Sequence, residues 1–125
     1  MMPARSPEYG IIPSVNSTLV TTMYQIIFYV PTTHLEPVKN AMFEAGAGKF
    51  DNYTHCAWQV LGEGQFMPLN GSDPFIGNTN EVERVPEYKV EMFCPKNVLT
   101  AVIEALKSEH PYEVPAYHVI KLENG

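Results

Sequence analysis

Basic side chains are scarce in this 125-residue chain, which has 8 Lys and Arg residues against 14 Asp and Glu and a formal net charge of -6. The basic residues are also scattered along the sequence rather than clustered. A nucleic-acid-binding protein needs a basic face that neutralises phosphates, so this class is excluded. Long apolar runs are missing as well. None approaches the roughly 20 residues that a membrane-spanning helix requires, and no membrane partner is expected.

Cysteine is equally scarce, with two residues, Cys56 and Cys94, and no CxxC pair. Both lie in apolar patterns that are typical of strands. We therefore expect two buried free thiols, which are typical of a reducing compartment and predict a cytoplasmic location.

No HxH or HxxxH pair occurs among the four histidines. A divalent cation such as zinc or copper would therefore need ligands that the fold, or several subunits, bring together. The candidates for such a metal site are His110, Glu113, His55 and Cys56. Because neighbours on a strand point to opposite faces, His55 and Cys56 are not expected to serve the same site.

Catalytic motifs are also missing from the sequence. It has no recognisable Ser-His-Asp or Cys-His nucleophile arrangement, and its acidic residues form no recognisable acid/base pair. We therefore predict no catalytic residues. The pattern favours a binding protein without excluding an enzyme.

The first part of the chain differs in composition from the rest. Residues 1–22 are rich in Pro, Ser and Thr, and they lack the basic start and apolar stretch of a signal peptide. We expect a flexible leader over 1–22 and a single domain over 23–125.

The domain contains one unit twice, 64 positions apart. Tyr24–Pro31 and Tyr88–Pro95 are both apolar, strand-like segments closed by proline. The correspondence continues through a helical pattern: Thr33 matches Asn97, Leu35 matches Leu99, Val38 matches Val102, Ala41 matches Ala105, and Met42 matches Leu106. A duplicated strand-helix unit indicates a fold with internal pseudo-symmetry.

The order of elements predicts an α+β, ferredoxin-like βαββαβ domain with a four-stranded antiparallel sheet and two helices on one face. Thr33 and Glu36 have the spacing of a capping box at the start of the first helix, and Gly46 and Gly48 end it. The second helix is expected over 96–109. The strands are expected over 24–30, 55–61, 85–94 and 114–122, and the second continues through a bulge into 65–67.

Alternation assigns the strand residues to two faces of the sheet. Eight side chains should face the helices: Tyr24, Ile26, Phe28, Val30, Tyr88, Val90, Met92 and Cys94. The opposite face should carry Ile27, Tyr29, Phe93, Tyr117 and Val119. That second apolar face needs a cover, and self-association is the simplest one.

Two connections are candidates for binding. The polar loop over 68–84 is long for so small a domain and holds apolar side chains at its centre, Pro74, Phe75 and Ile76. It either binds a protein partner or packs against its own oligomer. The glycines at 46 and 48 follow a helix, so they form a helix end and not a phosphate loop. Lys49, Asn52 and Tyr53 beyond them are ligand-binding candidates if that loop folds back.

The segment His110-Pro-Tyr-Glu113 lies in the turn between the second helix and the last strand. Pro111 can stop the helix, and Tyr112 can pack while its hydroxyl finds a partner. His110, Tyr112 and Glu113 are alternatively ligand-binding residues in a cleft between subunits. The residues alone leave both interpretations open.

Two stretches resemble known families. The combination of 46–53, His55-Cys56, Gly62-x-Gly-x-Phe66 and Pro74-Phe-Ile-Gly77 resembles the inserted domain of the NGG-interacting-factor-three-like family, whose members are often described as type 2 GTP cyclohydrolase homologues. The segment 110–115, HPYEVP, is similar to CutA-type divalent-cation-tolerance proteins. The first resemblance covers about 24–123. Both groups share the architecture of PII signalling proteins, which implies a homotrimer of ferredoxin-like subunits.

The first family also carries a two-part domain whose His, Asp and Glu residues bind two metal ions, and nothing comparable occurs in this sequence. The resemblance therefore implies the accessory module standing alone: a non-enzymatic trimer that binds a small molecule, a cation or a protein at clefts between subunits. The alternative is a CutA-like protein of metal tolerance that binds a divalent cation such as copper or zinc. A hydrolase related to the cyclohydrolase homologues is the third possibility.

Overall fold

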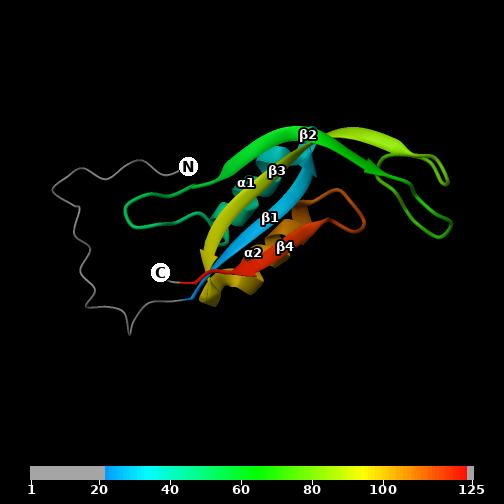
Figure 1. Ribbon diagram of the computed structural model, residues 1–125. Coiled ribbons are helices and arrows are strands. Elements are labelled where there is room, and N and C mark those ends of the chain that lie inside the picture. Colours follow the sequence, from blue (N-terminus) through cyan, green and yellow to red (C-terminus); the bar gives the residue numbers. More distant parts are fainter. Residues whose placement is uncertain (1–21, 124–125) are drawn as a thin grey trace.

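The computed structural model describes residues 22–123 (Figure 1). Its elements follow the order β1 (Met23–Pro31), η3 (Thr32–His34), α1 (Leu35–Glu44), β2 (Trp58–Phe66), β3 (Glu83–Pro95), α2 (Lys96–Glu109) and β4 (Tyr117–Lys121). The sheet has the order β2-β3-β1-β4, and every pairing is antiparallel. This is the predicted ferredoxin-like arrangement. The leader expected over 1–22 lies outside the described residues except for its last position.

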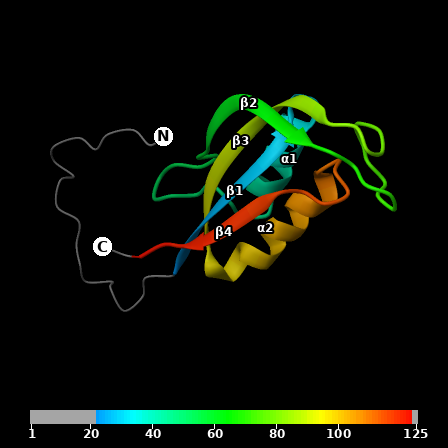
Figure 2. The same ribbon diagram turned by 45° about the vertical axis from the view of Figure 1, so that its right-hand side comes forward.

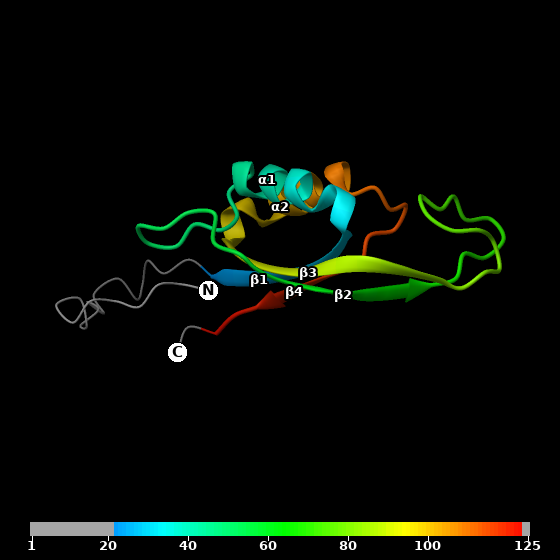
Figure 3. The ribbon, with the colours of Figure 1, turned by 90° about the horizontal axis from the view of Figure 1, so that it is seen from above.

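The two copies of the repeated unit lie side by side in the centre of the sheet. β1 pairs with β3 over its whole length, and α1 and α2 lie together above them (Figures 1 and 3). The core between the two layers is formed by alternate strand residues and by one stripe of each helix: Ile26, Phe28, Val30, Val38, Met42, Val90, Met92, Cys94, Val102 and Leu106, all fully buried. The alternation in both strands therefore gave the correct core face.

The expected capping box at the first helix is wrong. A single 3-10 turn, η3, separates the strand from the helix, so that His34 precedes α1 and no side chain caps it. The Thr33 hydroxyl bonds to the ring of His34, and the Glu36 carboxylate forms an ion pair with Lys39 at 3.2 Å. The other end of α1 follows the prediction, with Gly46 at a φ of 119°.

The second strand also differs from its expectation. β2 begins at Trp58, and His55 lies before it with a positive φ of 59°. The pairing with β3 is continuous from Trp58 to Phe66, so the glycines at 62 and 64 lie in a regular ladder and no bulge occurs. Because Cys56 precedes the strand, it is partly exposed and not buried as expected.

β4 is shorter than expected and has the opposite phase. Its residues Tyr117 and Val119 pair with Phe28 and Ile26, so they lie on the helix side of the sheet. Tyr117 packs against the core, and the Lys107 ammonium lies 5.7 Å from its ring centroid. The prediction that these two residues lie on the uncovered face is therefore wrong.

The face of the sheet away from the helices is bare in the single chain (Figure 3). This open face carries Ile27, Tyr29, Val60, Phe93 and Ile120, together with Trp58, as the register of the four strands shows. Trp58 is 44% exposed and Ile120 is 45% exposed. Between residues 22 and 123, no helix has the length and apolar character needed to cross a membrane.

Candidate functional site

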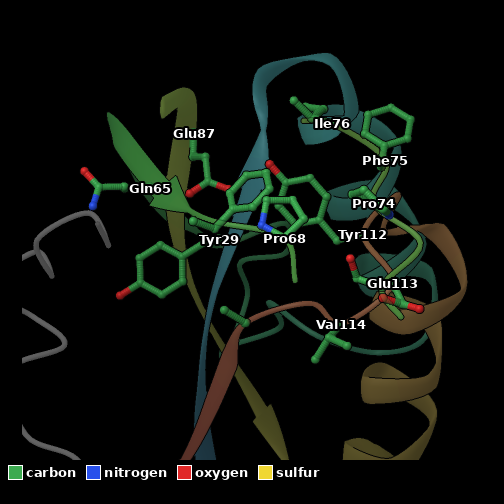
Figure 4. Close-up of a pocket in the computed structure, with 13 residues that line it drawn as sticks. Tyr29, Gln65, Pro68, Pro74, Phe75, Ile76, Glu87, Tyr112, Glu113 and Val114 are labelled. Carbon is green, nitrogen blue, oxygen red and sulfur yellow. The ribbon is translucent and has the colours of Figure 1, made fainter. Parts of the chain in front are cut away.

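The long loop after β2 returns beside the turn that precedes β4 (Figure 2). A pocket of about 290 Å³ lies there (Figure 4). We call it the loop pocket. Its lining consists of Tyr29, Gln65, Phe66, Pro68, Ser72, Pro74, Phe75, Ile76, Glu87, Tyr112, Glu113, Val114 and Ala116. It therefore brings together two sets of candidates that are far apart in the sequence: the loop residues at 74–76 and the turn residues Tyr112 and Glu113.

His110 anchors the turn to the sheet. Its side chain is buried, and its Nε2 lies 2.6 Å from the carbonyl oxygen of Tyr29. Its Nδ1 accepts a hydrogen bond of 3.1 Å from the backbone N–H of Tyr112. These two bonds assign the proton to Nε2 and describe a neutral imidazole. Burial lowers the pKa of His110, the hydrogen bond to the Tyr29 carbonyl opposes this effect, and nearby His34 lowers the pKa further.

Because both ring nitrogens of His110 are engaged with the backbone, the residue does not line the loop pocket. Two of the three expected binding residues in the turn, Tyr112 and Glu113, line the pocket. His110 does not line it; its hydrogen bonds to the backbone hold the turn in place. The geometry therefore supports a structural role for His110 and not a role in ligand binding.

Tyr112 lies at the centre of an aromatic cluster. Its ring centroid is 4.9 Å from that of His110, 6.0 Å from that of Phe66 and 6.3 Å from that of Phe75. The Tyr112 hydroxyl is buried and has no hydrogen-bond partner among residues 22–123. Burial raises the pKa of this hydroxyl, and the carboxylate of Glu87 raises it further. The hydroxyl therefore stays protonated at neutral pH.

The long loop is attached to the turn at only a few points. The backbone N–H of Asp73 donates to the Glu113 carboxylate at 3.2 Å, and the Phe75 ring meets the His34 ring edge to face at 5.4 Å. The base of the loop is closed by a hydrogen bond of 2.6 Å from the Asn80 N–H to the Pro68 carbonyl. The loop thus forms one wall of the pocket without being part of the sheet.

Acidic side chains alone carry charge in the pocket. Glu87 and Glu113 are both present, and none of the lining residues that the structure describes is Lys, Arg or His. Glu87 reaches the pocket by lying across β2 at Gly64, where an added Cβ would collide with the carboxylate. A glycine in a strand often marks such a close approach.

The other candidates lie at the far end of the sheet. Figures 1 and 3 show the segment between α1 and β2, with Lys49, Asn52 and Tyr53, at the end opposite the long loop. Phe50 and Tyr53 exchange two backbone hydrogen bonds of 2.9 Å, and Lys49 and Asn52 are exposed. This segment contributes nothing to the loop pocket.

The four metal candidates do not come together within one chain. His55 stacks near Phe43, with ring centroids 4.8 Å apart, in the same far segment as Cys56. His110 and Glu113 belong to the opposite end. In the part of the chain that the structure describes, no group of three or more His, Cys, Asp or Glu side chains could hold a metal ion.

Sequence reasoning missed Glu87, Gln65 and Tyr29 as pocket residues. Glu87 had one recognisable signal, the pair of glycines in the neighbouring strand, which the sequence analysis interpreted as a bulge. Tyr29 was expected on the uncovered face, and it does lie there opposite Lys89. It lines the pocket as well.

No known family model matches the chain. Among curated proteins, the chain is similar to a GTP cyclohydrolase 1 type 2 homolog of Mycobacterium leprae, with 43% identity over 103 residues. The Bacillus subtilis protein of the same name is 42% identical over 106 residues. These matches cover 82% and 85% of this chain but 27% and 28% of the relatives. The chain thus spans about a quarter of their length.

Among solved structures, the chain is similar to a Bacillus cereus protein related to NIF3, with a TM-score of 0.72 and 38% identity over 83% of this chain and 26% of that one. The divalent cation tolerance protein CutA of Archaeoglobus fulgidus has a TM-score of 0.59 at 16% identity, covering 82% of this chain and 86% of that one. The GlnK–ATP complex of Bacillus subtilis has a TM-score of 0.54 at 12% identity, covering 82% and 84%. At such low identity, the last two show a shared fold alone.

Proposed function

We infer that this chain, which is homologous to the PII- and CutA-like segment of the NIF3-related proteins, is a regulatory binding module. In this proposal it assembles as a homotrimer through its open face and binds a ligand in the loop pocket. The observation that carries the proposal is the convergence of the long loop and the 110–116 turn on one pocket, whose lining also includes Tyr29 of the open face.

The open face supports self-association. Trp58, Val60 and Ile120 are each more than a third exposed, and they share the face with Ile27 and Phe93. Each square ångström of apolar surface removed from water stabilises an assembly by roughly 25 cal/mol. A trimer is the state implied by the resemblance to PII-like proteins, and a sheet covered on only one side by helices suits it.

Tyr29 links the two surfaces. It lies on the open face, where its ring centroid is 6.4 Å from that of His118, and it also lines the loop pocket. A ligand that contacts Tyr29 therefore acts on a residue of the assembly interface. The long loop forms the opposite wall, so ligand binding favours one loop arrangement, which a protein partner can recognise.

The activity that the curated relatives' name states refers to proteins of which this chain spans about a quarter. The loop pocket is lined mainly by apolar side chains, with Glu87, Glu113 and Tyr112 among them, and this geometry suits binding. We therefore propose binding, and not hydrolysis, at the loop pocket.

Native mass spectrometry of the full chain tests the assembly. The expected mass is three times the 14.0 kDa of one chain, and a stable monomer would contradict the proposal. Trp58→Lys places a charge on the open face and should shift the population to monomer. Leu61→Lys is the matched control, because Leu61 is also exposed on the same strand but points to the other face. It should leave the trimer intact.

A further inference from the structure

The loop pocket combines acidic charge with apolar walls. Its charged residues are Glu87 and Glu113, and the walls come from aromatic rings, prolines and aliphatic side chains, including Phe66, Phe75 and Pro74. The whole chain also has a net charge of -6. A phosphate or carboxylate in this pocket would lose its hydration and meet only negative charge. The pocket is therefore unsuited to nucleotides and other anions.

A buried hydroxyl lies inside this apolar setting. The Tyr112 hydroxyl makes no hydrogen bond of good geometry with the residues that the structure describes, and the nearby Glu87 carboxylate is the acceptor that it faces. The hydroxyl can both donate and accept a hydrogen bond. In Figure 4 it points towards the side of the pocket from which the Glu87 carboxylate enters. A ligand ammonium group beside both can donate to the Glu87 carboxylate and to the Tyr112 oxygen.

Glu87 is directed to this place by the sheet. Its carboxylate lies over Gly64, in space that any other residue at that position would fill with a Cβ. The residue is half-buried, so the carboxylate is only partly screened by water. A glycine and a carboxylate on paired strands thus place one negative charge in the lining of an apolar pocket.

We propose that the loop pocket binds a small organic cation, namely a protonated amine carried on a single flat apolar ring. The ammonium group donates to the Glu87 carboxylate and to the oxygen of the Tyr112 hydroxyl. The ring packs against Phe66, Phe75 and the loop prolines, and the aromatic faces of the two phenylalanines also attract the positive charge. The volume of about 290 Å³ is at the small end of the range for ligand pockets, which limits the ligand to about one ring. This inference rests on the proposed function, because it assigns a ligand class to the same pocket.

The test uses three probes of matched shape: benzylamine, benzyl alcohol and benzoate. Each is titrated into the full chain at pH 7, and binding is followed by two-dimensional NMR. Benzylamine should shift the resonances of Glu87, Phe75 and Tyr112, with an affinity at least about ten-fold above that of the alcohol. Benzoate should leave these resonances in place.

Two carboxylate variants identify the charged contact. Glu87→Gln should weaken benzylamine binding by about ten-fold or more, because it removes the charge and keeps the shape. Glu63→Gln is the control. Glu63 is exposed on β2 beside Gly64 and does not line the loop pocket, so the affinity should change less than about two-fold.

Three results would overturn the ligand class: failure of benzylamine to bind at millimolar concentration, an affinity for benzoate equal to that for the amine, or unchanged amine binding in Glu87→Gln. If benzoate binds in the pocket of an intact trimer, the class is wrong and the proposed function stands. If the chain is a monomer and no probe reaches the pocket, both fail.

Discussion

The Nε2 of His110 lies 2.6 Å from the carbonyl oxygen of Tyr29, so a turn at the end of α2 is fastened to the end of β1. The side chain of the same Tyr29 lies at the pocket and on the open face. His110 thus fixes the position of the turn that presents Tyr112 and Glu113, while the binding surface itself comes from its neighbours. His110 is therefore a positioning residue and not a binding residue.

Replacing His110 by Ala should lower the free energy of unfolding by about 1–3 kcal/mol, because the Tyr29 carbonyl and the Tyr112 N–H lose their partner. Urea denaturation followed by circular dichroism measures this loss. Glu109→Ala is the matched control, since Glu109 is exposed and adjacent, and its effect should stay within about 0.5 kcal/mol. Equal stability of the two variants would show that the anchor is unimportant.

The same burial predicts a pH dependence. The pKa of His110 is lowered in the folded protein below the ordinary imidazole value of 6.5, so the unfolded chain takes up the proton first as the pH falls. Stability is therefore complete above pH 6.5 and decreases as the pH drops below it, towards the folded pKa. Thermal unfolding between pH 5 and pH 8 checks this sign.

Two histidine variants test whether His110 causes this pH dependence of stability. The slope of stability against pH should become smaller in His110→Gln, because that side chain cannot be protonated. It should persist in His118→Gln, since His118 is exposed on β4. A slope that is unchanged in His110→Gln would assign the pH dependence to other groups.

The central architecture was predictable because it depends on local periodicity. Alternation in 24–30 and 88–94 specified the core face, and the second helix has the predicted bounds, Lys96–Glu109. The phase of β4 was not predictable in this way. Apolar residues of β4 occur on both faces of the sheet: Tyr117 and Val119 lie on the helix side, and Ile120 lies on the open face. Alternation alone therefore does not show which set faces the helices. The choice between them depends on where the preceding turn is fastened.

The site was predictable only in pieces. Pro74, Phe75 and Ile76 were singled out by loop length, and Tyr112 and Glu113 by the composition of a turn. Their meeting in one pocket depends on contacts between residues about 40 positions apart, such as the bond from Asp73 to Glu113. No local pattern encodes such a contact. The sequence therefore pointed to two sites where the fold forms one.

Gly64→Ala should change the shape of the loop pocket with little effect on the stability of β2. The new Cβ would collide with the Glu87 carboxylate, which is the flexible end of its side chain and can move away. The free energy of unfolding should therefore change by less than about 1 kcal/mol, while the NMR signals of Glu87 and Tyr112 shift. Gly62→Ala is the control, because nothing lies within 4 Å of the Cβ that it would add. Similar spectra for both variants would contradict this placement of Glu87.

The two thiols should differ sharply in reactivity. Cys94 is fully buried in the core, and burial raises its pKa to about 11, whereas Cys56 is partly exposed. An aromatic disulfide reagent at pH 8 should therefore modify one thiol per native chain and two in urea. The variant Cys56→Ser should leave no fast-reacting thiol in the native protein. Rapid modification of Cys94 in that variant would show that the core opens readily.

Phe75 should control the order of the long loop. Its ring lies between His34, with centroids 5.4 Å apart, and Tyr112, at 6.3 Å, and few other contacts attach the loop. Phe75→Ala removes both contacts, so the amide protons of 68–82 should exchange faster by about ten-fold, with little change in those of the sheet. The control Leu69→Ala alters the same loop at a residue that is 59% exposed and does not line the pocket. Its exchange rates should match those of the unmodified chain. Faster exchange in both variants would mean that the aromatic contacts do not hold the loop, whereas an effect confined to Phe75→Ala identifies this ring as the link between the pocket and its movable wall.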